Sequence, residues 1–344
     1  MFLKALVNIH SNGREHVSPD GKWAVVIFAA RESSGVLIKT LKAAANSVGP
    51  SGQIELVVNG NPSLAREIVS RILFLQNASS QDASPIPILK LQLFSVPVNV
   101  WEVEFGDKAN AWNQYIHSIW CGERLAFFVD GYVVLNPNAI AELGQITLGD
   151  PYAIAGTGVP TQGGSAKAVR DELLERGGLH GNFCCLKGAT MQEMKSRNIR
   201  LPLALYRVDS LMGALLGLGF DPERQEWQKE RIAIAKEASW TTGRWSWSNI
   251  NDVKSQFKRL LRQFRGGFEK RAFRHYLEVQ KGSPEMLPES SPQMVTNYLR
   301  SRQFGWLAIR LYLLFNPFER VNMPDQLPRL KWSGHLSVVG PTLR

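Results

Sequence analysis

The chain has 344 residues, of which 44% are apolar and 10% aromatic, so it can bury a substantial core, and this composition argues against extended disorder. Its formal net charge of +10 favours an anionic partner, such as nucleic acid, an anionic membrane surface or a phosphorylated substrate. Three cysteines without metal-binding spacing indicate a reduced compartment, and we expect a cytoplasmic protein. No apolar run reaches about 18 residues and the N-terminal one is too short for a signal peptide, so we expect neither a spanning helix nor a leader.

The first half of the sequence alternates apolar runs, which suit buried strands, with amphipathic patterns, which suit helices. Strands are predicted at residues 23–30, 54–62, 97–105 and 125–129. Helices are predicted at residues 31–48, 63–76, 106–120 and 137–146, with a surface loop at 77–87. Strands that alternate with helices predict an α/β domain in which helices flank a mainly parallel, Rossmann-like central sheet.

Polar residues end the predicted strands. They are Arg31 and Glu32, Asn59 and Asn61, and Asp130. Because ligands of parallel α/β sheets bind beyond the carboxyl ends of the strands, we expect these side chains to gather on one rim of the sheet.

The second half of the sequence is less regular. Residues 151–166 are rich in glycine, proline and threonine and predict a mobile loop, which a short helix at 167–176 follows. Residues 201–222 place Asp209 at the entry to an apolar helix. The sequence contains neither a phosphate-binding glycine loop nor the common zinc and serine-hydrolase signatures.

Five segments occur in an order that is typical of one large enzyme family. They are VVIFAARESSGVLIKTLKAA, IELVVNGNP, GDKANAWNQYI, LAFFVDGYVVLNPNAI and YRVDSLMGALLGLG. In order and spacing they resemble the GT-A nucleotide-sugar glycosyltransferases of the family-2 type, over about residues 22–225. The resemblance implies a GT-A fold, a nucleotide-sugar donor, and an inverting transfer to a saccharide or lipid-linked acceptor.

The resemblance also implies which residues bind the donor. Asn59 or Asn61 stands where the family usually has an aspartate that contacts the base, and residues 106–113 match its G-x-K-A-x-A-x-N helix. His180 is flanked by Gly178 and Gly181, which allow a ligand to approach it closely. The candidate nucleotide-binding residues are Ala30, Glu32, Asn59, Asn61, Lys108, Asp130 and His180.

The resemblance further implies the residues for the chemistry. Asp130-Gly131-Tyr132 stands at the family's Asp-x-Asp, which holds a divalent metal and the diphosphate, so Asp130 is the metal candidate. Because Tyr132 replaces the second carboxylate, the need for Mg²⁺ or Mn²⁺ stays open. Asp209 matches the family's general base. Positive charge could come instead from Lys108, His180, Lys187 or Arg207.

Structural roles and other functions compete with this assignment. Asp130 before a glycine suits a turn, as do Asn59 and Asn61, and Asp209 suits a helix N-cap. A degenerate glycosyltransferase-like protein could bind nucleotide or act as a membrane scaffold without transfer. A sugar nucleotidyltransferase is the other rival, but it would need a glycine- and arginine-rich loop after the first strand.

The C-terminal part is basic and aromatic, and we divide the chain into a catalytic domain of residues 1–239 and a helical extension of residues 240–344. Residues 254–281 predict a basic amphipathic helix broken at Gly266-Gly267, and residues 303–321 a second, apolar helix. The basic helix could lie on an anionic membrane surface or pack on the catalytic domain. No recognised nucleic-acid motif accompanies it, so we do not expect nucleic acid as the partner.

Overall fold

The computed structural model of the chain describes residues 23–49, 52–79, 92–93, 96–162, 166–242, 263–302 and 336–338. The strands in these residues are β1 (Trp23–Ala29), β2 (Gln53–Asn59), β3 (Gln92–Leu93), β4 (Val96–Val103), β5 (Leu125–Asp130), β6 (Val133–Leu135), β7 (Ala155–Pro160), β8 (Phe183–Lys187), β9 (Ile232–Thr242) and β10 (Leu336–Val338). The α-helices are α1 (Ser34–Val48), α2 (Pro62–Ser79), α3 (Lys108–Gln114), α4 (Ala139–Gly149), α5 (Ala166–Arg176), α6 (Gly188–Ser196), α7 (Val208–Gly217), α9 (Ser291–Ser301) and a helix at residues 263–274. Shorter helical turns lie at Tyr115–Ile119, Lys229–Arg231, His275–Val279 and Pro284–Met286.

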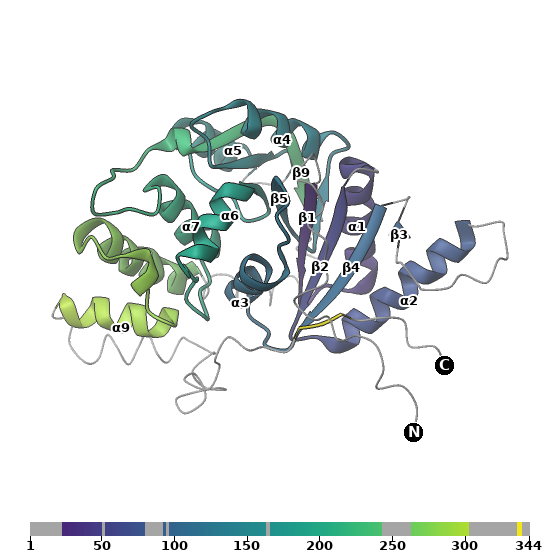
Figure 1. The fold of residues 1–344 in the computed structure, drawn as a ribbon, viewed down its shortest axis with the longest axis horizontal. Helices are drawn as coiled ribbons and strands as arrows, with labels where there is room; N and C mark the ends of the chain where they lie inside the picture. Colours follow the sequence, from purple (N-terminus) through teal and green to yellow (C-terminus); the bar gives the residue numbers. More distant parts are fainter. Residues whose placement is uncertain are drawn as a thin grey trace, which may run out of the picture.

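The centre of the sheet has the predicted α/β arrangement (Figure 1). Strands β4, β2, β1 and β5 lie side by side in that order, and all three pairings are parallel. Beyond β5 the sheet becomes mixed, because β8 runs antiparallel to β5 and β7 antiparallel to β8. The four parallel strands therefore present their carboxyl ends on one edge, and β8 begins at that same edge.

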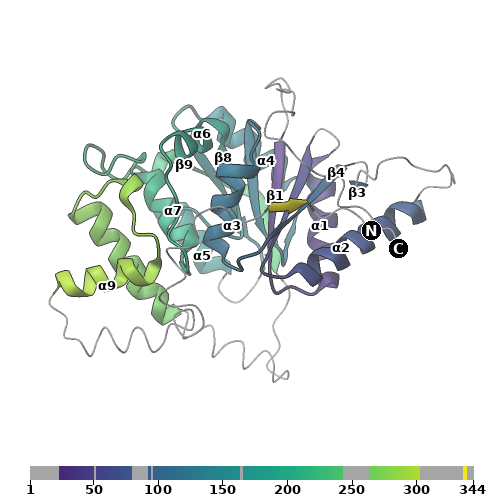
Figure 2. The same ribbon diagram turned by 60° about the horizontal axis from the view of Figure 1, so that its bottom comes forward.

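Two apolar cores cover the two faces of the sheet. Along β1, Val25 and Ile27 face the core formed with α1, α2 and α4, whereas Val26 and Phe28 face the core formed with α3, α6 and α7. This alternation follows from the two-residue period of a strand. Figures 1 and 2 show α1 and α2 on one side of the central strands and α3 and α7 on the other.

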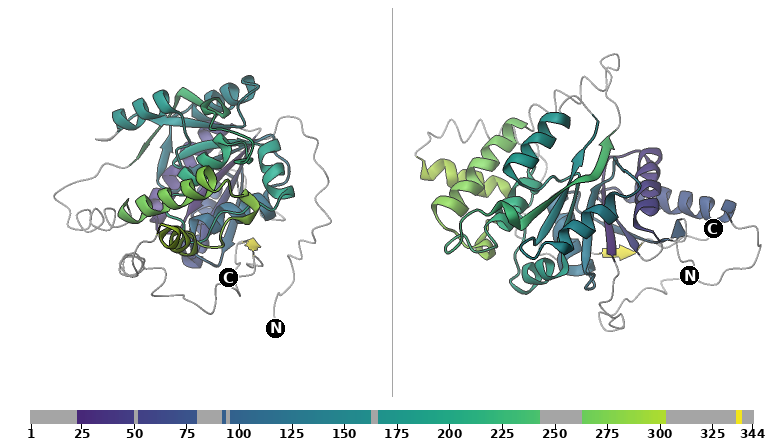
Figure 3. Two further views of the ribbon diagram at one scale, coloured as in Figure 1. Left: turned by 90° about the vertical axis from the view of Figure 1, so that its left-hand side faces the viewer. Right: turned by 90° about the horizontal axis from the view of Figure 1, so that it is seen from above.

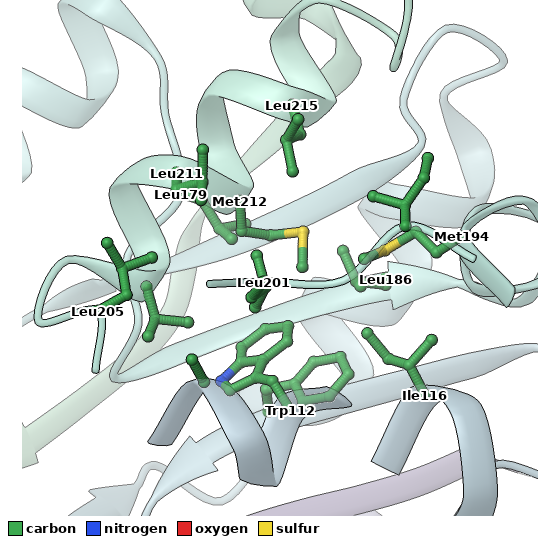
Figure 4. Packing of buried hydrophobic residues seen from close by; sticks show 14 of the residues in the cluster. Trp112, Ile116, Leu179, Leu186, Met194, Leu201, Leu205, Leu211, Met212 and Leu215 are labelled. Atoms are coloured by element: carbon green, nitrogen blue, oxygen red, sulfur yellow. The ribbon is translucent and has the colours of Figure 1, made fainter. Parts of the chain in front are cut away.

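An aromatic cluster anchors α3 on the sheet. The rings of Trp112 and Phe128 stack at 4.0 Å between centroids, and Tyr115 meets Phe128 edge-on at 5.5 Å. Figure 4 shows Trp112 lying among apolar residues from several elements, including Leu201 and Met212. Each such aromatic pair contributes about 0.5–1.5 kcal/mol beyond its buried area, so the position of α3 is well fixed.

The predicted loop at residues 151–166 is wrong in its central part, because residues 155–160 form the buried strand β7. The glycines that suggested a loop instead allow neighbouring elements to pack closely against β7. A Cβ on Gly156 would lie 2.1 Å from the hydroxyl of Thr147, and one on Gly158 would lie 2.4 Å from the carbonyl oxygen of Ala238. The predicted loop at 77–87 is also shorter than expected, since α2 continues to Ser79; the rest of it lies outside the described residues.

The C-terminal helices pack on the core that contains α3 and α7. Ala272, Phe273 and Leu277 are buried there, together with Met294 and Val295 of α9. Figure 3 shows these helices, in green to yellow-green, at the end of the molecule away from α2. The described part of the extension thus packs on the rest of the protein. The predicted helix at 303–321 lies outside the described residues.

The predicted break at Gly266-Gly267 is wrong, because residues 263–274 form one continuous helix. A Cβ on Gly266 would lie 2.8 Å from Nε of Arg207. The glycine therefore allows a neighbouring segment to approach the helix closely. The proposed boundary at residue 239 falls inside β9, which continues to Thr242, and the division into two parts stays a prediction.

A buried carboxylate joins the extension to the segment that precedes α7. Glu269 is fully buried and accepts hydrogen bonds from the backbone N–H groups of Tyr206 and Arg207 at 3.0 and 3.1 Å. It also accepts from the hydroxyl of Ser291 at 2.9 Å and pairs with Arg265 at 2.9 Å. Because every partner is itself held by the fold, this carboxylate connects three elements at one point.

Replacing Glu269 should therefore cost far more stability than replacing an exposed glutamate of the same helical region. We expect Glu269→Ala to lower the free energy of unfolding by about 3–5 kcal/mol, because it leaves Arg265 buried and unpaired. The matched control is Glu278→Ala, which breaks an exposed pair with Arg274 and should cost about 0–1 kcal/mol. Urea unfolding measures both, and equal losses would contradict this account of the network.

Candidate functional site

A pocket lies beyond the carboxyl ends of β1, β2, β4 and β5. A ligand site was expected at this rim because polar residues end the predicted strands. The residues that line the pocket are Phe28, Ala29, Ala30, Arg31, Glu32, Asn59, Gly106, Lys108, Asp130 and Tyr132. Five of the seven candidate nucleotide-binding residues are among them. The pocket thus gathers residues that follow four different strands, as expected for a ligand site of an α/β sheet.

Asp130, the last residue of β5, has a partner on each carboxylate oxygen. Nζ of Lys108 lies 2.5 Å from Oδ1, and the hydroxyl of Tyr132 lies 3.0 Å from Oδ2. Burial lowers the pKa of Lys108, but the charge of Asp130, the hydrogen bond to it and the charge of Asp209 together raise that pKa above its usual value. Lys108 is therefore a cation at neutral pH.

Tyr132 is a neutral hydrogen-bond donor in this site. Partial burial of its hydroxyl raises the pKa of Tyr132 far above its usual value, and the negative charge of Asp130 adds to the effect, although the residue as a whole is 41% exposed. The same hydroxyl lies 3.2 Å from the side-chain oxygen of Asn182. The phenol therefore stands beside Asp130 without adding a second negative charge.

The two asparagines after β2 have different surroundings. Asn59 is buried, lines the pocket and donates through Nδ2 to the carbonyl oxygen of Ala29 at 3.1 Å. Asn61 does not line the pocket. Its Oδ1 accepts from the backbone N–H of Leu64 at 3.1 Å, which caps the first turn of α2. Asn59 is therefore the better placed of the two to meet a ligand.

Glu32 folds back on its own turn. Its Oε2 accepts from the backbone N–H groups of Ala30 and Arg31 at 2.7 and 2.9 Å. Arg31 lines the same pocket and is exposed, and it was not among the candidate binding residues. Its position in the turn after β1 was the available signal.

His180 does not line the pocket, but it lies near Asp130 and Lys108 because β8 is antiparallel to β5. Residues that precede β8 therefore lie where β5 ends, and the backbone N–H of Asp130 donates to the carbonyl oxygen of Asn182 at 3.2 Å. Nδ1 of His180 accepts from the backbone N–H of Asn182 at 3.2 Å, so the neutral ring carries its proton on Nε2. Burial lowers the pKa of His180, although Asp209 and Asp130 oppose the shift.

Asp209 lies in the first turn of α7 but does not cap that helix. Arg207 occupies the N-cap position, and no side chain caps there. Oδ2 of Asp209 is 3.3 Å from the backbone N–H of Gly181, beside His180. Because Asp209 influences the pKa values of Lys108 and Tyr132, it belongs to the same electrostatic neighbourhood as the pocket.

The segment that leads to Asp209 is held by side chains of α3, of its N-cap residue and of the turn after it. Oδ2 of Asp107 accepts from the backbone N–H of Ala204 at 3.0 Å. Asn113 makes two hydrogen bonds to the backbone of Leu201, at 2.8 and 2.9 Å. His117 donates to the carbonyl oxygen of Ile199 at 3.0 Å. The helix that presents Lys108 thus also fixes the path to Asp209.

Two other candidate cations have different places in the fold. Lys187 pairs in register with Leu125, at the opposite end of β5 from Asp130, and its Nζ donates to the carbonyl oxygen of Asp150. Arg207 packs against Gly266 of the extension. Of the four candidates for positive charge, Lys108 is the one that lines the pocket.

The protein side chains at Asp130 offer a divalent cation a single carboxylate. Mg²⁺ and Mn²⁺ need several oxygen ligands, and a carboxylate is the usual protein one. Here one carboxylate is already paired with an ammonium group, and its neighbour is a neutral phenol. Within the described residues, no three or more histidine, cysteine, aspartate or glutamate side chains are grouped to hold a metal ion.

Comparison with known structures agrees with the fold. The chain is similar to the mannosyltransferase PcManGT from Pyrobaculum calidifontis, solved in complex with GDP-Man and Mn²⁺, with a TM-score of 0.50 and 12% identity over 92% of this chain and 80% of that one. It is also similar to S. aureus TarS 1-349, with a TM-score of 0.43 and 10% identity over 90% and 77% of the two chains. No family model and no curated protein sequence matches this chain. The protein has a GT-A-like glycosyltransferase fold, as the sequence resemblance implied.

His117 should make the stability of this part of the protein depend on pH. Burial lowers the pKa of His117 from 6.5 to about 4, and Arg200 adds to the shift. Between these two pH values the unfolded chain binds the proton and the folded chain does not, so the free energy of unfolding falls as the pH falls.

The matched variant is His117→Gln, which keeps a donor for Ile199 but cannot titrate. We expect it to lose less stability than the unsubstituted protein when urea unfolding is compared at pH 7 and pH 4.5. Asp107, whose pKa burial raises to about 6, has the opposite effect but is present in both proteins. Identical pH dependence of the two proteins would show that His117 has no such role.

Proposed function

We propose that the protein is a glycosyltransferase that transfers a sugar, with inversion, from a nucleotide-sugar donor to a saccharide or lipid-linked acceptor. The observation that supports this most is the pocket at the carboxyl ends of the parallel strands, which combines Asp130, Lys108 and Asn59. Asn59 suits the edge of the nucleotide base, since its amide oxygen can still accept a hydrogen bond. Lys108 and Arg31 suit the diphosphate.

Asp209 is the proposed general base. It would take the proton of the acceptor hydroxyl as the oxygen attacks the anomeric carbon, while the bond from that carbon to the diphosphate oxygen breaks and the nucleoside diphosphate leaves with the electron pair. The carboxylate is partly exposed and next to the glycine-flanked His180, where an acceptor could approach. His180, neutral and with its proton on Nε2, can donate a hydrogen bond to the bound sugar or diphosphate.

Asp209→Asn should separate catalysis from binding. We expect it to lower the transfer rate about 100-fold or more, because a positioned general base contributes about 10²–10⁴-fold, and to leave donor affinity unchanged. The assay measures nucleoside diphosphate released from a panel of nucleotide sugars with acceptors. Asp171→Asn, on the exposed face of α5, is the control. Full activity of Asp209→Asn would refute the assignment.

We also propose that an anionic membrane surface is one place where the acceptor is met. Lys270, Arg271, Arg274 and Lys281 are exposed, within the predicted basic segment 254–281, while the other face of the helix is buried in the domain. The first residues of the basic segment, 254–262, lie outside the described residues. No helix in the described residues has an apolar stretch that could span a membrane. The association would therefore be electrostatic and sensitive to salt.

Liposome flotation tests the surface association. We expect binding to vesicles that contain anionic lipid and none to neutral vesicles, with a loss at high salt. Lys270→Glu/Lys281→Glu should weaken binding, since each lysine near an anionic surface contributes about 1 kcal/mol. Lys39→Glu/Lys167→Glu, with exposed lysines on α1 and α5, is the charge-matched control. Equal binding to neutral vesicles, or equal loss in both double variants, would contradict the proposal.

A further inference from the structure

The position that a divalent cation would occupy next to Asp130 is filled by an amino group of the protein itself. We propose that Lys108, held by Asp130, takes the place of the metal and binds the donor diphosphate directly. This inference rests on the proposed function, because it concerns how the same pocket neutralises the leaving group.

The geometry at Asp130 leaves little for a metal to bind. Both carboxylate oxygens have partners, Lys108 on one and Tyr132 on the other. Tyr132 stands two residues after Asp130, where a second carboxylate would complete an acidic pair, and it donates a hydrogen bond instead of supplying a charged ligand. A metal would have to displace an ammonium group from the one carboxylate at this position.

The other nearby carboxylates are also engaged. One oxygen of Glu32 accepts from the two backbone N–H groups of its own turn. The two oxygens of Asp209 accept from the backbone N–H groups of Ser210 and Gly181. Mg²⁺ is usually bound by one or two carboxylates together with phosphate oxygens and waters. The carboxylates at this rim are thus satisfied by protein donors, in an arrangement that does not depend on a metal.

Lys108 has the properties that the proposed role needs. Its Nζ carries three N–H donors, and among the described residues its hydrogen-bond partner is Asp130, so two donors remain for phosphate oxygens. The side chain lines the pocket and is 35% exposed, whereas that of Asp130 is 11% exposed. The better-buried carboxylate therefore fixes the direction of the ammonium group before the ligand arrives, which is how preorganised charge acts most effectively.

The charged residues that line the pocket are two cations and two carboxylates. The charges of Lys108, Arg31, Asp130 and Glu32 make the lining formally neutral, but the two carboxylates are turned to protein donors. Glu32 binds backbone N–H groups, and Asp130 binds Lys108 and Tyr132. The cations of Lys108 and Arg31 are thus the charges that a diphosphate would meet.

Nucleoside diphosphate binding is the first test, because it does not need a known sugar or acceptor. UDP and GDP are titrated calorimetrically into the full chain, once with EDTA and once with Mn²⁺. We expect the same affinity in both conditions. Lys108→Ala should weaken binding roughly 10- to 100-fold, as expected for loss of a hydrogen bond to a charged group, while Lys108→Arg should retain most of it. Lys39→Ala, exposed on α1, is the control.

Direct metal binding is the second test. Electron paramagnetic resonance of Mn²⁺ added to the unsubstituted protein should show only the signal of the free ion. When nucleotide is also added, the bound signal should equal that of Mn²⁺ with nucleotide alone. Tyr132→Asp combined with Lys108→Ala restores two carboxylates and removes the ammonium group, so this double variant should gain a bound Mn²⁺ signal.

The outcomes separate the inference from the function on which it rests. Nucleotide binding that requires Mn²⁺, or a bound Mn²⁺ signal in the unsubstituted protein, overturns the lysine assignment and leaves the proposed glycosyltransferase intact. Equal nucleotide binding by Lys108→Ala also overturns it. Absence of nucleotide binding both with EDTA and with Mn²⁺ contradicts the proposed function itself, and the inference with it.

Discussion

The segment from Ile199 to Arg207 is held from two sides by buried polar side chains, and the relation between the two halves of the site depends on it. Asn113 and His117, which follow Lys108 in the chain, bind its first residues. Glu269 of the extension binds the N–H groups at its end. Buried polar groups of this kind are costly when unpaired, so each bond restricts the segment to one path. That path ends at α7, and α7 presents Asp209.

Local strain in this segment supports the same view. Ala204 has a φ of 59°, in the left-handed region that residues with a side chain rarely adopt. Such a conformation costs of order 1–3 kcal/mol and persists when its surroundings determine it. Here the N–H of Ala204 is bound by Asp107, the residue before Lys108. The strained residue is therefore tied to the same helix start that presents the lysine to the pocket, which couples the start of α3 to the path that leads to α7.

The C-terminal extension contributes to the site through packing and hydrogen bonds. Its helix at residues 263–274 lies against the loop before α7, and Gly266 allows Arg207 to come close. The sequence predicted a break at this glycine because glycine disfavours helices on its own. Tertiary contacts override that local preference, since the buried face of the helix and the network of Glu269 stabilise the helix as a whole. A similar override explains β7, whose glycines look like a loop and serve close packing.

The sequence by itself determined the parallel centre of the fold and most of the pocket. Continuous apolar runs specify strands buried on both faces, and residues that end parallel strands must meet at one edge, so Arg31, Glu32, Asn59 and Asp130 could be placed together from the sequence. Asn61, which was placed with them, lies outside the pocket lining. Only the tertiary structure decided that β8 runs antiparallel and brings His180 and Asn182 to that edge. It also decided that Lys108 and Tyr132 occupy the two oxygens of Asp130. The physical reason is that periodicity and strand ends are local properties of the chain, whereas strand direction and the pairing of charges arise from contacts between segments far apart in sequence.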